Sequence, residues 1–371
     1  MPTIQRSLQP RNIFTANRRP IARGFLVVIG LSCLLGSIVS EALAQGGFDR
    51  IVRRNGSDRG EVTKINSQEV TLSRGGVVKL VPSEEIRSIH FSGEPAELNQ
   101  ARSALARGQF GEAQKFLAKL DRDRVTRDVI VQDIDYYQAH CIAKLALSGQ
   151  GNLEQAIEQV SSFYAHHRSS YHLPAAIELW GDLLMRAEKQ DEARNQYVKL
   201  GKARSPIYKM RSALLVGQSY QTQQEYALAQ SEYEKVLQQA AAPSVANSSV
   251  AQEEKLAAQL GMAINQAATG NAEAAIEVVG QVIEQADPED ARLQGQAYNA
   301  LGKCYLKNGD QKAALYAFLH VDVLYGRIPE HHAQALYELS QLWPVLGYES
   351  RGREAREKLN QQYPGSRWAG K

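Results

Sequence analysis

The chain has 371 residues, of which 43% are hydrophobic and 22% charged, enough for two ordinary domains or one elongated repeat array with a small companion. Its net charge is +3, but residues 1–44 hold five arginines and one glutamate, which leaves the remainder at −1. The part after residue 44 therefore lacks the basic footprint of a nucleic-acid-binding protein.

Residues 1–44 have the pattern of an export signal. Several arginines precede an apolar run from Phe25 to Val39, and Ala42-Leu43-Ala44 forms a small-x-small cleavage site. We expect cleavage after Ala44 and a periplasmic or secreted protein, with an uncleaved anchor as the alternative. Membrane contact is expected only through that signal or anchor. Cys33 lacks the residues that usually precede a lipoprotein cysteine, and its loss with the signal leaves two cysteines, too few for a disulfide framework.

Residues 48–92 read as a small all-β module. Five short runs rich in β-branched residues are separated by turn residues such as Asn55-Gly56 and Gly75-Gly76. The pattern, which ends in "VPSEEIRSIHF", resembles the small SH3-like or Sm-like barrels of bacterial envelope proteins. Sm-like barrels can bind RNA, but this stretch has no aromatic stacking platform. We expect a docking or spacer module.

Residues 95–371 read as helices joined by short polar turns, because β-branched runs give way to Ala, Gln, Glu, Leu and Tyr. One long interruption by small residues, "AAPSVANSS", spans Ala241–Ser249.

A repeated spacing organises these helices. In residues 298–318, Tyr-x2-Leu-Gly-x2-Tyr is followed by Gly-Asp and then by Ala-x3-Phe. The pattern resembles the tetratricopeptide repeat, a helix–turn–helix unit of about 34 residues. Its helix glycine is Gly302, and the corresponding glycines of three further copies are Gly181, Gly217 and Gly261.

Three further hairpins complete the prediction of a mainly α protein: a tetratricopeptide-like α-solenoid of about seven hairpins behind a barrel-like β module. They begin near Ala101, Gly151 and Ala335. The last departs most from the pattern, with Ser340 in the glycine position and Pro344 early in the turn, as suits a capping repeat.

The helical period assigns a role to each repeated position. Tyr298, Leu301, Gly302 and Tyr305 fall on one face, where glycine permits close approach of the second helix, which presents Ala314 and Phe318. Cys304 lies off that face, at a place held elsewhere by Leu183, Ser219 and Ala263. We therefore interpret Cys304, and likewise Cys141, as packing residues rather than reactive thiols, since no base is placed to activate them.

A second stripe of the first helices points away from the hairpin core. The resemblance implies that this stripe lines a concave, peptide-binding groove. An acidic or C-terminal carboxylate group would suit its lysines, so the expected partner is a protein or peptide. The candidate residues are Glu178, Asp182, Arg186, Gln218, Thr222, Met262, Gln266, Asn299, Lys303 and Lys307, with Leu214 and Ala258 between them.

Catalytic patterns are weak. His166, His167 and His172 lack the spacing of zinc ligands on one helix face, and there is no phosphate loop or nucleophile elbow. The sequence therefore favours a non-enzymatic envelope scaffold or adaptor without cofactor or metal. The alternatives are a cell-wall or glycan-binding protein, and an enzyme using Cys304 or the histidine cluster.

Overall fold

The computed structural model describes residues 47–369. The export signal expected in residues 1–44 lies outside this range. No helix within the described range combines the length and apolar character that crossing a bilayer demands.

The N-terminal module is a five-stranded antiparallel sheet, as expected. Its order β4-β3-β2-β1-β5 leaves β4 and β5 at the edges. Ile51, Val70 and Ile89 are fully buried in its core. Gly75 and Gly76 adopt positive φ in the β3–β4 turn, which glycine tolerates without strain. The strands are β1 (Asp49–Arg53), β2 (Ser57–Ile65), β3 (Glu69–Arg74), β4 (Val77–Pro82) and β5 (Ile86–His90).

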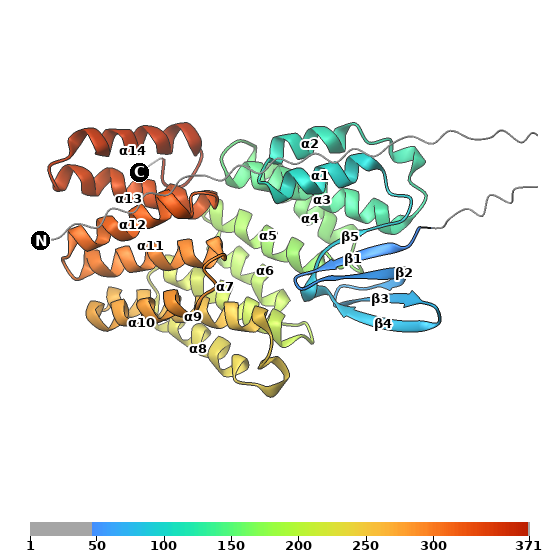
Figure 1. Cartoon of the computed structure of the whole chain (residues 1–371), viewed down its shortest axis with the longest axis horizontal. Coiled ribbons are helices and arrows are strands. Elements are labelled where there is room, and N and C mark those ends of the chain that lie inside the picture. The colour runs from blue at the N-terminus through green and yellow to red at the C-terminus, as the bar shows by residue number, and fades with distance from the viewer. Residues whose placement is uncertain (1–46, 370–371) are drawn as a thin grey trace, which may run out of the picture. The chain divides into compact units, whose positions relative to one another are not determined.

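The rest of the described chain is helical. Fourteen α-helices pair in sequence order into hairpins, α1 with α2 through α13 with α14, which confirms the tetratricopeptide-like array (Figure 1). The helices are α1 (Ala96–Ala106), α2 (Phe110–Ala118), α3 (Asp128–Leu147), α4 (Leu153–His166), α5 (Leu173–Arg186), α6 (Gln190–Leu200), α7 (Pro206–Thr222), α8 (Tyr226–Ala240), α9 (Ser249–Ala268), α10 (Ala272–Gln285), α11 (Ala291–Lys307), α12 (Gln311–Leu324), α13 (Pro329–Val345) and α14 (Glu349–Gln362).

The odd-numbered helices, here called first helices, form one layer of the array. They contact one another directly in the pairs α3–α5, α7–α9, α9–α11 and α11–α13, while each also packs on the second helix of its own hairpin. Because neighbouring hairpins share these contacts, apolar clusters extend across hairpin boundaries, as in the cluster that runs from α7 to α11.

The repeat glycines act as predicted in three hairpins. A Cβ added to Gly181 would lie 2.1 Å from the Tyr197 ring, and one added to Gly302 would lie 2.5 Å from Phe318. The same close approach joins Gly217 to Tyr233 at 2.7 Å. Each glycine therefore removes the side chain that would keep an aromatic ring of the second helix from the first.

Gly261 differs from this scheme. Its own second helix carries Val279 in the aromatic position, and the atoms nearest to an added Cβ belong instead to the Tyr233 ring of the preceding hairpin, 2.4 Å away. One tyrosine thus packs against the glycines of two first helices, α7 and α9.

Both cysteines of the described chain are buried, with side chains that have no exposed surface. Burial raises the pKa of Cys304 to about 11 and that of Cys141 to about 12, so both are thiols at neutral pH. This supports the packing interpretation.

Pro344, which the sequence places early in the turn of the last hairpin, lies inside α13 instead. It belongs to the final turn of α13, and its ring lies 2.6 Å from a Cβ added to Gly352 of α14. Glycine at 352 thus leaves room for the proline ring, where a side chain on α14 would clash with it.

Candidate functional site: the first-helix face

The side of the first helices that points away from the hairpin cores is here called the first-helix face. Its centre is a charged ladder across three helices. Arg211 of α7 donates from Nε to Glu178 of α5 at 3.1 Å, and its Nη1 lies 3.5 Å from Glu254 of α9. Arg211 is 20% exposed and Glu178 28%, so both charges keep contact with solvent. Glu254 is buried, at 6% exposed, so the ladder is open to solvent only at its α5 and α7 members.

Two predicted residues of α5 have partners at this face. Asp182 accepts a hydrogen bond of 2.8 Å from the Tyr197 hydroxyl, which fixes the ring that packs on Gly181. Arg186 donates from Nη2 to the backbone carbonyl of Gly365, at 2.7 Å, so it binds a segment 179 residues away. Asp182 therefore supports packing, whereas Arg186 reaches across the array.

The middle of the predicted stripe is polar and partly open. Thr222 is exposed and donates to the Gln218 carbonyl at 2.9 Å. Met262 and Gln266 are half-buried, and Met262 packs against the core. Leu214 and Ala258 are fully buried and belong to that core.

The predicted residues of α11 differ in how exposed they are. Asn299, expected on the open stripe, is 2% exposed and donates to the His331 carbonyl of α13 at 3.0 Å. It is buried because α11 and α13 contact one another there. Lys307 is exposed, and the half-buried Lys303 has its Nζ 5.8 Å from the centre of the Trp368 ring.

Arg211 and Glu254 were not among the predicted residues. Arg211 lies six positions before Gly217, about one turn beyond the offsets used to define the stripe, and falls on the same side of the helix. Extending the stripe would have found it. The sequence could not single out Glu254, because the adjacent Glu253 is also a glutamate and pairs with a different residue, Arg54.

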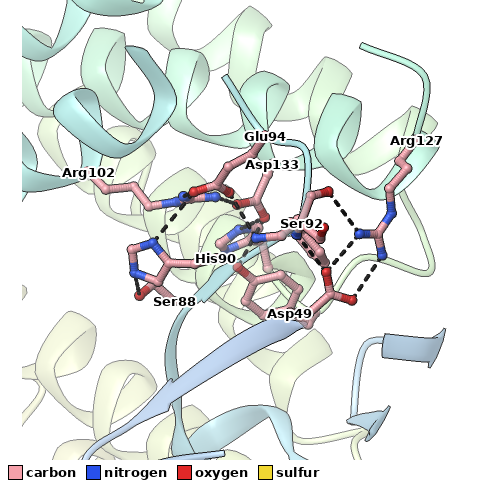
Figure 2. Close-up of polar contacts among 11 residues, drawn as sticks. Asp49, Ser88, His90, Ser92, Glu94, Arg102, Arg127 and Asp133 are labelled. Carbon is pink, nitrogen blue, oxygen red and sulfur yellow. Dashed lines mark hydrogen bonds and ion pairs between the residues drawn. The ribbon is translucent and has the colours of Figure 1, made fainter. Parts of the chain in front are cut away.

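A second polar cluster joins the sheet to the first hairpins (Figure 2). Asp133 of α3 is 1% exposed and accepts hydrogen bonds from Arg102 of α1, from the Tyr171 hydroxyl at 3.0 Å and from His172 Nε2 at 2.8 Å. Arg102 also donates to Glu94 at 2.7 Å, just after β5. We call these residues the junction network.

Charges in the junction network are matched. Burial alone would raise the pKa of Asp133, but the contacts with His172 and Arg102 outweigh it and lower that pKa. Burial also lowers the pKa of His172, so at neutral pH His172 supplies a hydrogen bond and Arg102 the balancing charge.

A third contact holds the first strand. Asp49 of β1 accepts from Arg127, which precedes α3, at 2.7 and 3.0 Å, and from the backbone amide of Ser92 at 2.7 Å (Figure 2). Bidentate arginine–carboxylate pairs of this kind fix orientation as well as distance. The sheet is thereby attached to the helical array.

The three histidines of residues 166–172 do not form one site. His166 bonds the Ser162 carbonyl, His167 bonds Asp135, and His172 is buried on Asp133. Within residues 47–369, no group of three histidine, cysteine or carboxylate side chains is placed to hold a metal ion. The buried His172–Asp133 pair is surrounded by Tyr136, Tyr137 and Tyr171, an arrangement that favours a structural role.

No protein-family model matches the chain, and no curated protein matches it significantly. Among solved structures, it is similar to a tetratricopeptide repeat protein from Parabacteroides merdae, with 17% identity, a TM-score of 0.47, and coverage of 72% of this chain and 91% of that one.

Two further structures are similar. A Rap protein complexed with competence and sporulation factor shows 14% identity and a TM-score of 0.49 over 73% of this chain and 76% of that one. PilW, a type IV pilus biogenesis factor, shows 15% identity and a TM-score of 0.39 over 65% and 97%. At these values the matches carry no conclusion about function. The architecture itself is a tetratricopeptide-like helical array behind a five-stranded sheet.

Proposed function

We propose that the protein is a non-enzymatic adaptor of the bacterial envelope that binds a protein or peptide partner on the first-helix face. The observation that carries this proposal is the charged ladder of Glu178, Arg211 and Glu254, which crosses three successive first helices. Glu178 and Arg211 are partly exposed, while the buried Glu254 holds Arg211 from the other side. Because the two open charges are fixed in advance, an extended peptide can bind them without rearrangement.

The chemistry of the partner follows from the far end of the face. Lys303 and Lys307 of α11 carry positive charge at its C-terminal part, and Arg186 adds a guanidinium from α5. An acidic side chain or a C-terminal carboxylate is the group that such cations bind best. The proposed partner is therefore an acidic protein segment.

The envelope location depends on the N-terminal signal, and we expect the mature chain to begin at Gln45. Removing residues 1–44 would take away five arginines and the apolar run Phe25–Val39. Intact-mass measurement of the protein from its native envelope tests this. A chain that retains Met1 to Ala44 would contradict cleavage and favour the anchored alternative.

Charge reversal tests the binding surface. We expect Lys303→Glu with Lys307→Glu to lower the free energy of unfolding by no more than about 1 kcal/mol, because Lys307 is exposed and Lys303 loses one cation–π contact with Trp368. The same double change should weaken partner capture and reduce its salt sensitivity, since it removes two attractive charges. Crosslinking pull-down from native envelopes, quantified at two salt concentrations, provides the measurement.

The matched control reverses two lysines on second helices. Lys235 of α8 and Lys312 of α12 are both exposed, so Lys235→Glu with Lys312→Glu changes the net charge equally but away from the first-helix face. Equal losses in the two variants, or a loss only in the control, would place the interaction elsewhere on the protein.

A further inference from the structure

The chain after α14 returns to the first-helix face. Residues 363–369, here called the C-terminal segment, form a compact turn in which the Ser366 amide donates to the Tyr363 carbonyl at 3.0 Å and the Ala369 amide to the Ser366 carbonyl at 3.1 Å. In a linear repeat array each unit contacts only its neighbours. This segment contacts hairpins far from its own.

Its base is fixed on the last hairpin. Trp368 is 8% exposed and packs with Leu336 of α13 and Leu359 of α14. The Tyr363 hydroxyl lies 2.8 Å from Nδ1 of His332, which itself contacts Asp322. These contacts hold the two ends of the turn, and Pro364 and Gly365 lie between them.

The projecting tip touches the second and third hairpins. Gly365 and Gly149, in the turn between α3 and α4, meet backbone to backbone, and a Cβ on either would lie within 1.9 Å of the other's Cα. Arg186 of α5 binds the Gly365 carbonyl at 2.7 Å. Contacts 216 and 179 residues apart thus join the end of the array to its early part.

The same segment contacts two residues of the predicted binding stripe. Arg186 binds Gly365, and the Lys303 ammonium lies over the Trp368 ring. The Arg186 contact is incomplete, because its buried Nε has no hydrogen-bond acceptor. A carbonyl that satisfies only part of a guanidinium is replaceable by a group that satisfies more of it.

We propose that the C-terminal segment is an autoinhibitory latch, which covers Arg186 and Lys303 of the first-helix face, rests on Gly149 beside it, and is displaced when a partner binds. This inference rests on the proposed function for the identity of the face. The latch itself is a property of the free protein, so it is testable without the partner.

The first test asks whether the latch is closed in solution. In the full chain with Cys33→Ser, cysteines are introduced at Gln150 and Ser366, on either side of the Gly149–Gly365 contact. Cys141 and Cys304 are buried, so a short bismaleimide should react at the new positions. We expect an intramolecular crosslink that Gly365→Val reduces severalfold, while Gly280→Val, whose Cβ meets nothing within 4 Å, leaves it unchanged.

The second test asks whether the segment behaves as a ligand. The probe is a fluorescent synthetic peptide of residues 363–371. It is added to the full chain with Gly365→Val and Trp368→Ala, which removes the Trp368 packing and the Gly149–Gly365 contact of the chain's own segment. We expect the peptide to bind this variant about tenfold more tightly than the parent, in which the closed form competes. Adding Arg186→Ala should reverse the gain, and a peptide carrying Gly365→Val should bind the opened variant poorly.

The outcomes separate the two proposals. Absence of the crosslink in the parent, or equal peptide binding by parent and opened variant when circular dichroism shows both folded, overturns the latch. Neither result measures partner capture, which the lysine reversal tests. Because Lys303 lies over the Trp368 ring, the crosslink is also measured in the lysine variant, so that loss of capture with the latch still closed is assigned to the adaptor surface. Conversely, a closed latch together with unchanged partner capture by the lysine variant would retain the latch and reject the acidic-partner surface.

Discussion

Asp133→Ala is expected to lower the free energy of unfolding by about 3–5 kcal/mol, the usual cost of removing one partner of a buried ion pair. The change removes the acceptor of Arg102, Tyr171 and His172 at once. Arg102 is 7% exposed and, among residues 47–369, would keep Glu94 as its one charged partner. Denaturant unfolding followed by circular dichroism measures the loss.

Asp135→Ala is the matched control, two residues along the same helix. Its carboxylate also contacts an arginine and a histidine, Arg122 and His167, but its side chain is 27% exposed. Exposed ion pairs contribute about 0–1 kcal/mol. If both variants lost the same free energy of unfolding, burial would not be the reason that the junction network stabilises the protein.

Acidification provides an independent check. Because the pKa of Asp133 is lowered in the folded protein, the stability it adds is complete above its unfolded value of 3.8 and disappears as pH falls through the folded value. The difference between parent and Asp133→Ala should therefore hold from pH 7 to pH 5 and shrink only below about pH 3.8. If the stability difference between the parent and Asp133→Ala vanished near pH 6, the stabilisation would depend on a group other than Asp133.

Gly181→Leu is expected to cost about 1–3 kcal/mol through overpacking. Its Cβ would fall 2.1 Å from the Tyr197 ring, and that ring is held by the hydrogen bond from its hydroxyl to Asp182. Either the ring moves and loses its bond, or α5 and α6 separate. The measurement is the shift in denaturation midpoint.

Gly280→Leu serves as the reference change, because Gly280 lies in α10 with open space around its Cβ position. It should cost little or add slightly to stability, since leucine favours helix more than glycine does. Adding Tyr197→Ala to Gly181→Leu removes the clashing ring, so the second change should cost less in that background than in the parent. Strict additivity of the two changes would argue against the predicted clash.

Residue spacing predicted the helical array well. The glycine and aromatic positions of the repeat determine how two neighbouring helices meet, and Gly181, Gly217 and Gly302 pack as expected. Contacts within one hairpin can therefore be predicted from the positions of these residues in the sequence. Gly261 shows their limit, because Val279 left a space that an aromatic ring from another hairpin occupies.

The site was less predictable, because its contacts join residues distant in sequence. Helical phase placed Asn299 on the open stripe, but the neighbouring α13 covers it. The helical period also placed Arg186 on the first-helix face, but it could not show that Arg186 binds the Gly365 carbonyl. The position of the sheet depends on single long-range pairs, Asp49 with Arg127 and Arg54 with Glu253, which leave no periodic trace in the sequence.

Those long-range pairs have a mechanical consequence. A helical repeat array extends easily under tension, because each hairpin contacts only its neighbours. Here the sheet is tied at the start of α3 by Asp49–Arg127, before α7 by the 2.6 Å bond from Ser205 to Glu84, and on α9 by the 2.7 Å pair of Arg54 with Glu253. Tension between α3 and α9 would therefore be carried by the hydrogen-bonded strands as well as by the helices. We expect the sheet to make this part of the array stiffer than the rest.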